Sequence, residues 1–451
     1  MKRVLLIIGA TVATITASAQ HHRLERYNNS GAEPTVYIIS VSETDTISCA
    51  PQSCQQAVMN KNAAIRSAIE DHKQATRDGF QPVGMPSAIF ADKNNAFSFA
   101  IGGDIALRAA YSFDRTVNNI DMVPYNVPMT LTPADKQEIR MDATTSRLFI
   151  RGIANTEKLG QVHIFMDFDF RGGATGSYTP RIRSGYVQML GLTVGRDVST
   201  FCDLTAAPTT IDFQGPNAYN FRFATMIRYE HSFLDNHLTA GAAAEMPSVS
   251  GTYGETLSAI PQRVPDFPIY LQYSWGENRD SHIRASAVFR NLYAYNVARN
   301  KNTSLFGWGV QASGRINVLD FLNIFFNGVY GQGITPYIQD LTGSGLDFTP
   351  NPLNPTSIQT MPMYGWQAAA QVNITPRWSV SGGYSAVNVE RKHGSYTEDQ
   401  YKQGQYVFGN VFFHISPRMK IAAEYLYGVR KNMNTVKNHA NRINVMAQYN
   451  F

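Results

Sequence analysis

The chain has 451 residues, of which 43% are hydrophobic, 12% aromatic and only 16% charged. The charged fraction lies well below the roughly 25% of an ordinary soluble domain, while Gly, Tyr and Phe are plentiful, which excludes a disordered chain. The net charge of +5 includes Lys2 and Arg3 of a predicted targeting segment, so the rest of the chain carries +3. That excess is too small for a nucleic-acid-binding surface, and we expect no nucleic-acid partner.

The N-terminus has the order of a secretory signal peptide. Two basic residues precede an apolar stretch over residues 4–15, and the sequence ASA at positions 17–19 supplies the small residues of a cleavage site. We expect cleavage after Ala19, since the apolar stretch is short for a retained anchor helix. Beyond it, no apolar run approaches the roughly 18 to 20 residues that a membrane-spanning helix requires.

Three cysteines in an exported chain leave at least one thiol unpaired. Cys49 and Cys54 could form a disulfide across the short loop between them, or between subunits, in an oxidising compartment. Cys202 is then the free thiol.

Residues 20–95 are polar and irregular, and we interpret them as a periplasmic segment with one helix, at about residues 55–74. Val58, Ile65, Ala68 and Ile69 fall on one face of this helix, although two polar residues interrupt the face. Two interpretations remain open: a marginal amphipathic helix beside a larger domain, or a short intersubunit coiled coil.

From residue 96 onward, apolar and polar residues alternate, as they do in a strand with one apolar face. The clearest case is residues 442–451, where the apolar side chains stand at the odd positions. The pattern predicts sixteen strands, at about residues 96–112, 145–153, 160–170, 181–189, 191–196, 223–231, 237–245, 267–275, 281–291, 304–315, 322–331, 364–373, 377–386, 405–414, 418–427 and 442–451.

The connections between these strands alternate between short turns and long loops, and the long ones include 113–144, 197–222, 246–266, 332–363 and 387–404. An even number of strands with loops sorted in this way is typical of an outer-membrane β-barrel, whereas a soluble sandwich has no reason to sort them. Hydrocarbon offers the backbone no hydrogen-bonding partners, so the sheet must close on itself.

The predicted fold is therefore all-β: a 16-stranded antiparallel transmembrane β-barrel over residues 96–451, preceded by the short helical periplasmic segment. A barrel of this size is too wide for side chains to fill, so its lumen holds water. Aromatic residues near the strand ends suit the two interfacial girdles. They are Phe97, Phe113, Tyr273, Trp275, Trp308, Trp366, Trp378, Tyr427 and Phe451.

The connection from Asp197 to Arg222 is the candidate constriction, because it is compact and contains three aspartates but no basic residue before its last position. If it folds inward, an acidic lip faces the arginines of the strands, and the transverse field with the arginine excess favours anions. The alternative is that the arginines pair with carboxylates of the wall, such as Asp104, Glu230 and Glu424, and only stabilise it. The predicted pore-lining residues are Arg147, Arg151, Asp167, Asp169, Arg181, Arg183, Asp203, Asp212, Arg228, Arg284, Arg315 and Arg442.

Residues 181–231, RIRSGYVQMLGLTVGRDVSTFCDLTAAPTTIDFQGPNAYNFRFATMIRYEH, resemble the corresponding region of the DcaP-like trimeric porins of Gram-negative outer membranes, and residues 146–172 fit the same family. The resemblance implies a 16-stranded barrel, a homotrimer, a periplasmic N-terminal helix and uptake of small, often anionic solutes. The weak helical stripe, Cys49 and Cys54 depart from the family pattern. The match is carried by Arg181, Arg183, Tyr186, Gly191, Gly195, Thr200, Phe201, Asp203, Pro208, Asp212, Phe213, Gly215 and Pro216.

Motifs of catalysis are missing from the sequence: it contains no Gly-rich phosphate loop, no H-E-x-x-H and no paired C-x-x-C. His163 and Asp167 share a strand face but lie roughly 13 Å apart at about 3.3 Å per residue, too far to bind one metal ion. We expect no enzyme activity, no metal and no cofactor.

The sequence therefore predicts a passive outer-membrane channel for small hydrophilic, preferentially anionic solutes such as dicarboxylates. Its expected partners are membrane lipid, lipopolysaccharide, two further copies of the chain, and the barrel assembly machinery through the C-terminal Phe451. One alternative is a sugar or oligosaccharide channel in which Phe149, Phe165 and Tyr270 form a stacking track. Another is a non-conducting barrel that serves as a surface receptor or adhesin.

Overall fold

The computed structural model describes residues 36–40, 55–77, 79–92, 95–113, 120–130, 132–133, 136–174, 176–276, 278–351, 353–392 and 397–451. The predicted signal peptide and the two cysteines at positions 49 and 54 lie outside these residues. Within this part of the chain, no helix is both long and apolar enough to cross a membrane.

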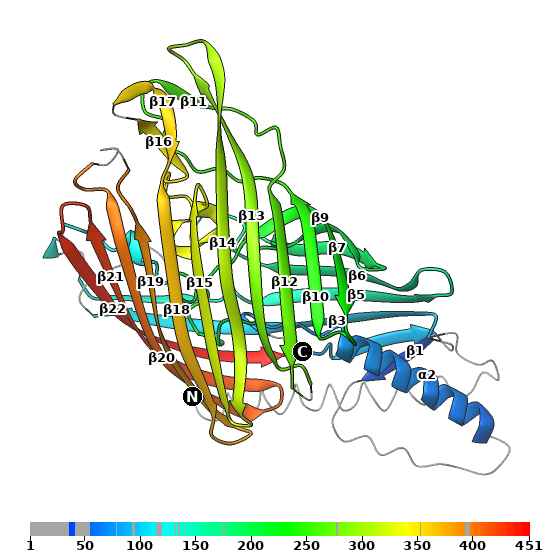
Figure 1. Cartoon of the computed structure of the whole chain (residues 1–451). Helices are drawn as coiled ribbons and strands as arrows, with labels where there is room; N and C mark the ends of the chain where they lie inside the picture. The colour runs from blue at the N-terminus through cyan, green and yellow to red at the C-terminus, as the bar shows by residue number, and fades with distance from the viewer. Residues whose placement is uncertain are drawn as a thin grey trace.

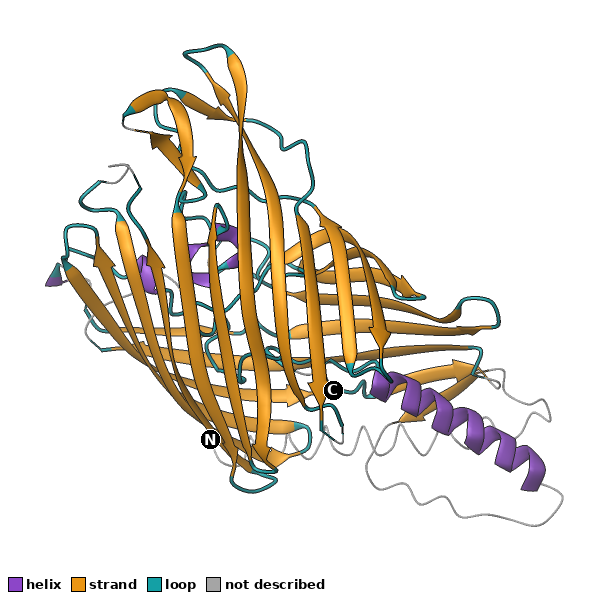
Figure 2. Cartoon of the chain, viewed as in Figure 1, coloured by secondary structure: helices purple, strands orange, loops and turns teal. Residues whose placement is uncertain are grey.

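Sixteen antiparallel strands pair in sequence order, and the last pairs with the first, so the sheet closes into a barrel (Figures 1 and 2). The predicted strand number and order are confirmed, and each predicted strand overlaps one strand of the ring. The ring consists of β3 (Phe97–Ser112), β5 (Arg147–Thr156), β6 (Gly160–Asp169), β7 (Arg181–Met189), β8 (Leu192–Val198), β9 (Phe223–Phe233), β10 (Leu238–Glu245), β12 (Phe267–Trp275), β13 (Ser281–Asn296), β14 (Lys301–Leu319), β15 (Leu322–Gln332), β18 (Pro362–Asn373), β19 (Trp378–Val389), β20 (Tyr401–Ser416), β21 (Met419–Asn432) and β22 (Lys437–Asn450).

The two faces of the wall differ as the alternation predicted. In β22 the side chains of Ile443, Val445 and Tyr449 are exposed on the outside, while Arg442 and Asn444 between them are buried inside the barrel. A spanning strand presents apolar side chains to lipid and polar ones to the lumen. Several predicted girdle aromatics are exposed on the outer face, among them Phe97, Phe113, Tyr273, Trp366 and Trp378.

The N-terminal part adds a helix and two strands at one end of the barrel. The helix α2 (Gln55–Gln74) has the predicted bounds. Asp71 accepts hydrogen bonds from Asn155 and Gln161, which flank the β5–β6 turn, so α2 lies at the end of the barrel that carries the short turns. Figure 1 shows α2 projecting from this end, near β1 (Val36–Ser40).

The apolar face of α2 packs within the chain. Ala68, with Ile65 and Ile69, contacts Ile89 and Ala91 of β2 (Ala88–Asp92). β2 pairs with residues 98–101 of β3, on the same edge of β3 that binds β22 further along, and so continues the wall beyond the C-terminus. These contacts agree with the interpretation of an amphipathic helix beside a larger domain.

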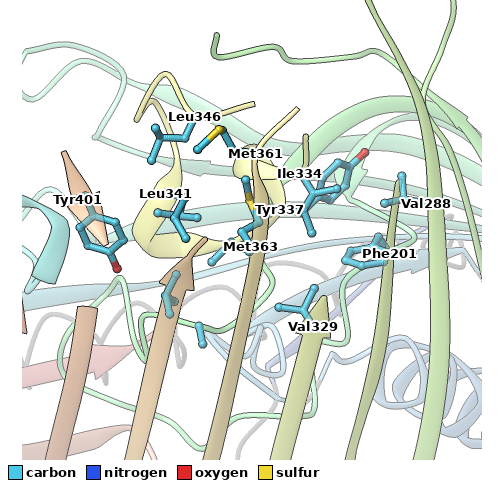
Figure 3. Close-up of a cluster of buried hydrophobic side chains, with 14 of the residues drawn as sticks. Phe201, Val288, Val329, Ile334, Tyr337, Leu341, Leu346, Met361, Met363 and Tyr401 are labelled. Carbon is cyan, nitrogen blue, oxygen red and sulfur yellow. The ribbon is translucent and has the colours of Figure 1, made fainter. Parts of the chain in front are cut away.

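Three long connections contain structure that the sequence did not predict. These elements are η1 (Pro124–Asn126) and β4 (Glu138–Asp142), β11 (Leu257–Ala259), and η3 (Thr335–Tyr337), η4 (Gln339–Leu341), β16 (Phe348–Asn351) and β17 (Asn354–Thr360). The 333–361 connection folds back into the barrel, where Ile334, Tyr337 and Leu341 pack against Phe201 and Val329 (Figure 3). At the long-loop end, apolar side chains of this connection therefore occupy part of the lumen and pack against the wall.

Candidate functional site

Residues 199–222, here called the inward loop, connect β8 to β9 and cross the lumen. Hydrogen bonds fix the loop to strands that are distant from β8 and β9 in the barrel. Asp203 Oδ2 accepts a hydrogen bond from Ser313 Oγ of β14 at 2.7 Å. On β18 and β19, Gln367 donates to the Ala206 carbonyl at 2.9 Å, and Ser385 accepts from the Ala218 amide at 2.9 Å. The loop thus folds into the barrel and is fixed to strands on its far side.

The two central aspartates of the loop serve as anchors. Asp203 lies 2.8 Å from His282 Nε2 on β13, and Asp212 accepts from the Tyr406 hydroxyl on β20 at 2.8 Å. Each is only 1% exposed. Burial and the nearby carboxylates of Asp121 and Glu424 raise the pKa of Asp212 well above its ordinary value, which favours its uncharged form. Asp203 and Asp212 therefore fix the loop to the wall and do not face the lumen as an acidic lip.

The first group of predicted arginines lies on β5 and β7 and pairs with aspartates of β6. Arg147 binds Asp167 with Nη2–Oδ2 at 2.5 Å, and Arg181 binds Asp169 at 2.5 Å. A β-bulge opposite Asp167 and Phe168 makes Arg183 the extra residue, and its guanidinium reaches both aspartates, at 3.2 and 3.1 Å. This cluster has the wall pairing that the sequence left open as an alternative.

A second group surrounds Asp197 at the end of β8. Arg228 lies 3.2 Å from Asp197 and 3.0 Å from Glu230. Arg284 lies with its guanidinium carbon 3.5 Å from the centre of the Tyr270 ring and donates to the Thr200 carbonyl. Arg228 and Arg284 are therefore brought together with the start of the inward loop.

The other three predicted arginines stand apart from these groups. Arg151 donates to the His72 carbonyl at 2.8 Å and so binds the C-terminal end of α2, where helical carbonyls lack partners. Arg442 donates to the Ile120 carbonyl at 2.7 Å, and Arg315 donates to Asn323 Oδ1 at 3.1 Å.

A chain segment that the sequence reasoning missed also enters the barrel. Residues 76–77 and 79–83, here called the lumenal segment, follow α2. Arg77 forms a two-pronged ion pair with Asp197, with both N–O distances 2.7 Å. Arg147 donates to the Gln81 and Pro82 carbonyls at 2.9 and 3.0 Å. Residues 197–221 contain three aspartates but no Lys or Arg, so a basic partner for Asp197 has to come from another part of the chain. The sequence does not indicate which part supplies it.

Two cavities share Arg77 in their lining. The first, of about 430 Å³, is lined by the end of α2 and by strands β5, β6, β7 and β9, with Arg77, Arg151, Arg228 and Glu230 as its charged residues. The second, of about 280 Å³, is lined by the start of the inward loop, with Arg77, Arg228 and Arg284 balanced by Asp197, Asp203 and Glu230. The first cavity carries a formal excess of two positive charges, and the second carries none.

The aromatic rings of the predicted stacking track are covered by protein. Phe149 and Phe165 pack with Val83 of the lumenal segment, and Arg284 covers the Tyr270 ring. All three rings are buried, so they do not offer a row of free faces to a sugar.

Cys202 is a free cysteine in the inward loop, as predicted if the other two pair. Burial, followed by the nearby Glu245 carboxylate, raises the pKa of its thiol to about 12, so it remains protonated and unreactive at neutral pH.

The stability of α2 docked on the barrel is expected to depend on pH through His72. Its side chain is fully buried, with Nε2 3.1 Å from the Ser98 hydroxyl oxygen. Burial, followed by the nearby charge of Arg151, lowers the pKa of His72 to about 4. The Asp71 carboxylate raises this pKa and His163 lowers it, both by smaller amounts. Because the folded pKa lies below the unfolded value of 6.5, the docked helix has its full stability above about pH 6.5 and loses it as the pH falls toward 4. Allowing for solvent screening, we expect a loss of about 1 kcal/mol at pH 5.

Hydrogen exchange of α2 at pH 7 and pH 5 measures this loss. The variant His72→Asn, which cannot be protonated in this range, is expected to show the same protection of α2 at both values. An equal pH dependence in wild type and variant would contradict the assignment to His72.

The comparisons with known proteins agree with this geometry. Residues 52–451 match the model of the DcaP outer membrane protein family. Among solved structures, the chain is similar to the outer membrane channel DcaP of Acinetobacter baumannii, with a TM-score of 0.69 and 19% identity over 79% of this chain and 98% of that one. It is also similar to the outer membrane protein OmpT of Vibrio cholerae (0.51, 11% identity, 79% and 98% covered) and to an anion-selective porin from Comamonas acidovorans (0.50, 12%, 79% and 100%).

Among curated proteins, the comparison finds no match to this chain. The family match nevertheless covers most of the sequence and includes every strand of the barrel. The resemblance seen in residues 146–231 is thereby confirmed: this chain belongs to the DcaP family of outer membrane proteins and has the closed 16-stranded barrel of a porin-type channel.

Proposed function

We propose that the protein is a passive outer-membrane channel that favours small hydrophilic anions such as dicarboxylates, with the inward loop as part of its filter. The family and the closed barrel support passage through the lumen. The observation that carries the anion preference is the 430 Å³ cavity at the short-turn end, where three arginines stand against one glutamate. Charged rings of one sign in a narrow, low-dielectric passage select ions of the opposite sign.

The proposed orientation and assembly follow from the same architecture. We infer that the short-turn end and α2 face the periplasm, that the signal peptide ends at residue 19, and that lipid and lipopolysaccharide cover the exposed outer face. A homotrimer is supported by the trimeric form of the structural neighbour OmpT. Phe451, whose backbone exchanges hydrogen bonds with Gly103, is the proposed signal for the barrel assembly machinery.

The test is the reversal potential of the purified protein in planar bilayers under a KCl gradient. We expect anion preference for wild type and a permeability ratio of anion to cation lowered on the order of twofold in Arg228→Gln. Arg228 is the informative position because its two carboxylate partners retain other contacts when the arginine charge is removed. Asp197 still pairs with Arg77, and Glu230 still accepts a hydrogen bond from the Tyr270 hydroxyl.

The matched control is Arg377→Gln, an exposed arginine between β18 and β19 that is expected to leave the ratio unchanged. Cation preference in wild type would end the anion proposal. Block by oligosaccharides and not by dicarboxylates would favour a sugar channel, and a barrel closed to all ions would favour a receptor or adhesin.

A further inference from the structure

Two chain segments line the cavities around Arg77: the inward loop, which connects two barrel strands, and the lumenal segment, which precedes the barrel. We propose that the lumenal segment is the second half of the filter, and that Arg77 is a specificity-determining residue of the channel. This inference rests on the proposed function in one respect, namely that ions pass through the lumen.

Arg77 lies where it can act on a solute. Its guanidinium spans both oxygens of Asp197 and also donates to the Tyr186 hydroxyl at 2.9 Å. The Arg77 side chain keeps 25% of its surface exposed, whereas that of Asp197 keeps only 2%. The arginine is therefore the member of the pair that faces the lumen, and the buried carboxylate fixes its position.

Arg77 also marks the boundary between the two cavities. Together with Arg228 and Glu230, it lines both the 430 Å³ cavity next to α2 and the 280 Å³ cavity beside the inward loop. A solute that moves from one cavity to the other passes along these three side chains. Arg77 supplies one of the three arginine charges at each cavity, so it contributes to the size of the passage and to its charge.

The lumenal segment is fitted to the inward loop. The Phe80 amide donates to the Leu204 carbonyl at 2.6 Å, and the Phe80 ring lies edge-on to Tyr219, with 5.0 Å between ring centres. Gln81 donates to the Phe213 carbonyl at 2.6 Å and accepts from Arg183. These contacts hold the segment and the loop together as one body inside the barrel.

Two glycines make this close approach possible. Gly79 has φ +102°, and a Cβ at this position would lie 2.3 Å from the Leu204 carbonyl oxygen. Gly215 has φ +73°, and a Cβ there would lie 2.6 Å from the Phe80 ring. A side chain at either position forces the two segments apart, because both the space and the backbone conformation suit glycine alone.

The first experiment separates the charge of Arg77 from its bulk, using single-channel conductance and reversal potential in planar bilayers. Arg77→Ala is expected to raise conductance on the order of twofold and to lower anion preference, since it widens the boundary, leaves the 280 Å³ cavity with one negative charge in excess and halves the positive excess of the 430 Å³ cavity. Arg77→Ala combined with Asp197→Ala keeps the net charge of wild type, so conductance is expected to rise while selectivity returns toward wild type. Lys73→Ala, which removes an equal charge from the exposed surface of α2, is the control and is expected to change neither.

The second experiment disturbs docking without changing any charge. Gly79→Ala is expected to raise conductance, whereas Gly84→Ala, whose Cβ would meet no atom within 4 Å, is expected to match wild type. Circular dichroism confirms that each variant retains its barrel.

Wild-type conductance and reversal potential in both folded Arg77→Ala and folded Gly79→Ala would overturn the inference. The outcome is distinguishable from a failure of the anion proposal. If wild type prefers cations, that proposal ends, but a difference in conductance between wild type and these variants still supports the role of the lumenal segment.

Discussion

Glu424→Ala is expected to release the middle of the inward loop from the wall and to raise single-channel conductance on the order of twofold, with added current noise. The Glu424 carboxylate on β21 accepts the Ile211 amide at 3.0 Å and the Asp212 amide at 2.7 Å. It also accepts from Asn410 and Asn444, at 3.0 and 3.3 Å. Its removal leaves these four N–H groups without their acceptor, at a cost of about 1–3 kcal/mol for each that stays buried. The loop lowers this cost by moving away from the wall toward water.

Glu424→Gln is expected to have a smaller effect than Glu424→Ala. The side-chain oxygen of the glutamine can still accept a hydrogen bond from one loop amide, but its NH₂ group faces the other amide donor, so we expect an intermediate conductance. Gln371→Ala is the control, because Gln371 points inward from β18 and donates to Asn373, outside the inward loop. Equal conductance of wild type and a folded Glu424→Ala variant would show that the loop holds its position without this carboxylate.

The barrel was predictable because its signal is repeated many times along the chain. Each strand that faces lipid on one side and water on the other alternates its side chains, and sixteen such segments with sorted loops point to one architecture. The helix was predictable for the same reason, since Ile65, Ala68 and Ile69 recur at helical spacing and do pack on one surface. Local periodicity therefore identified the sixteen barrel strands and the helix α2.

The proposed filter was only partly predictable, because its contacts join residues far apart in the chain. Arg77 and Asp197 are 120 positions apart, and Asp203 and His282 are 79 apart. Which residues meet depends on the curvature of the closed barrel and on the path of each loop through it, and neither leaves a periodic trace in the sequence. The bulge at Arg183 is a slip of one residue that alternation alone cannot reveal.

The predicted acidic lip of the inward loop is wrong for a related physical reason. The aspartates at 203 and 212 stand in a loop without basic residues, which predicted a free acidic lip. Inside the barrel each instead meets donors from the opposite wall, namely Ser313 and His282 for Asp203 and Tyr406 for Asp212. A carboxylate removed from water is stable only with such donors, so a buried loop uses its acids as anchors.

Arg290→Met is expected to destabilise the long-loop end of the barrel by about 3–5 kcal/mol, because it removes the buried guanidinium that pairs with two buried carboxylates. The Arg290 side chain is fully buried on β13, where it lies 3.1 Å from both Asp266 and Asp347. It also donates to the Gly333 and Ser248 carbonyls, each at 2.5 Å. One guanidinium thus joins the 246–266 and 333–361 connections to the wall.

The two carboxylates are not affected equally. Asp266 keeps Arg222 at 3.1 Å and the Tyr337 hydroxyl at 2.9 Å, whereas Asp347 keeps only hydrogen-bond donors such as the Ser250 and Thr335 amides among the described residues. We therefore expect protease cleavage in Arg290→Met to begin in the 333–361 connection, with a lower urea midpoint for unfolding in detergent.

Two further variants define the cause. Arg290→Lys is expected to recover little of the lost stability, because an ammonium group cannot reproduce the fork that reaches two carboxylates and two carbonyls at once. Arg299→Met, at an exposed position between β13 and β14, removes the same charge outside the buried network. If Arg290→Met and Arg299→Met unfold at the same urea concentration, the buried arginine does not stabilise these connections, and the apolar cluster around Tyr337 and Leu341 holds them in place without it.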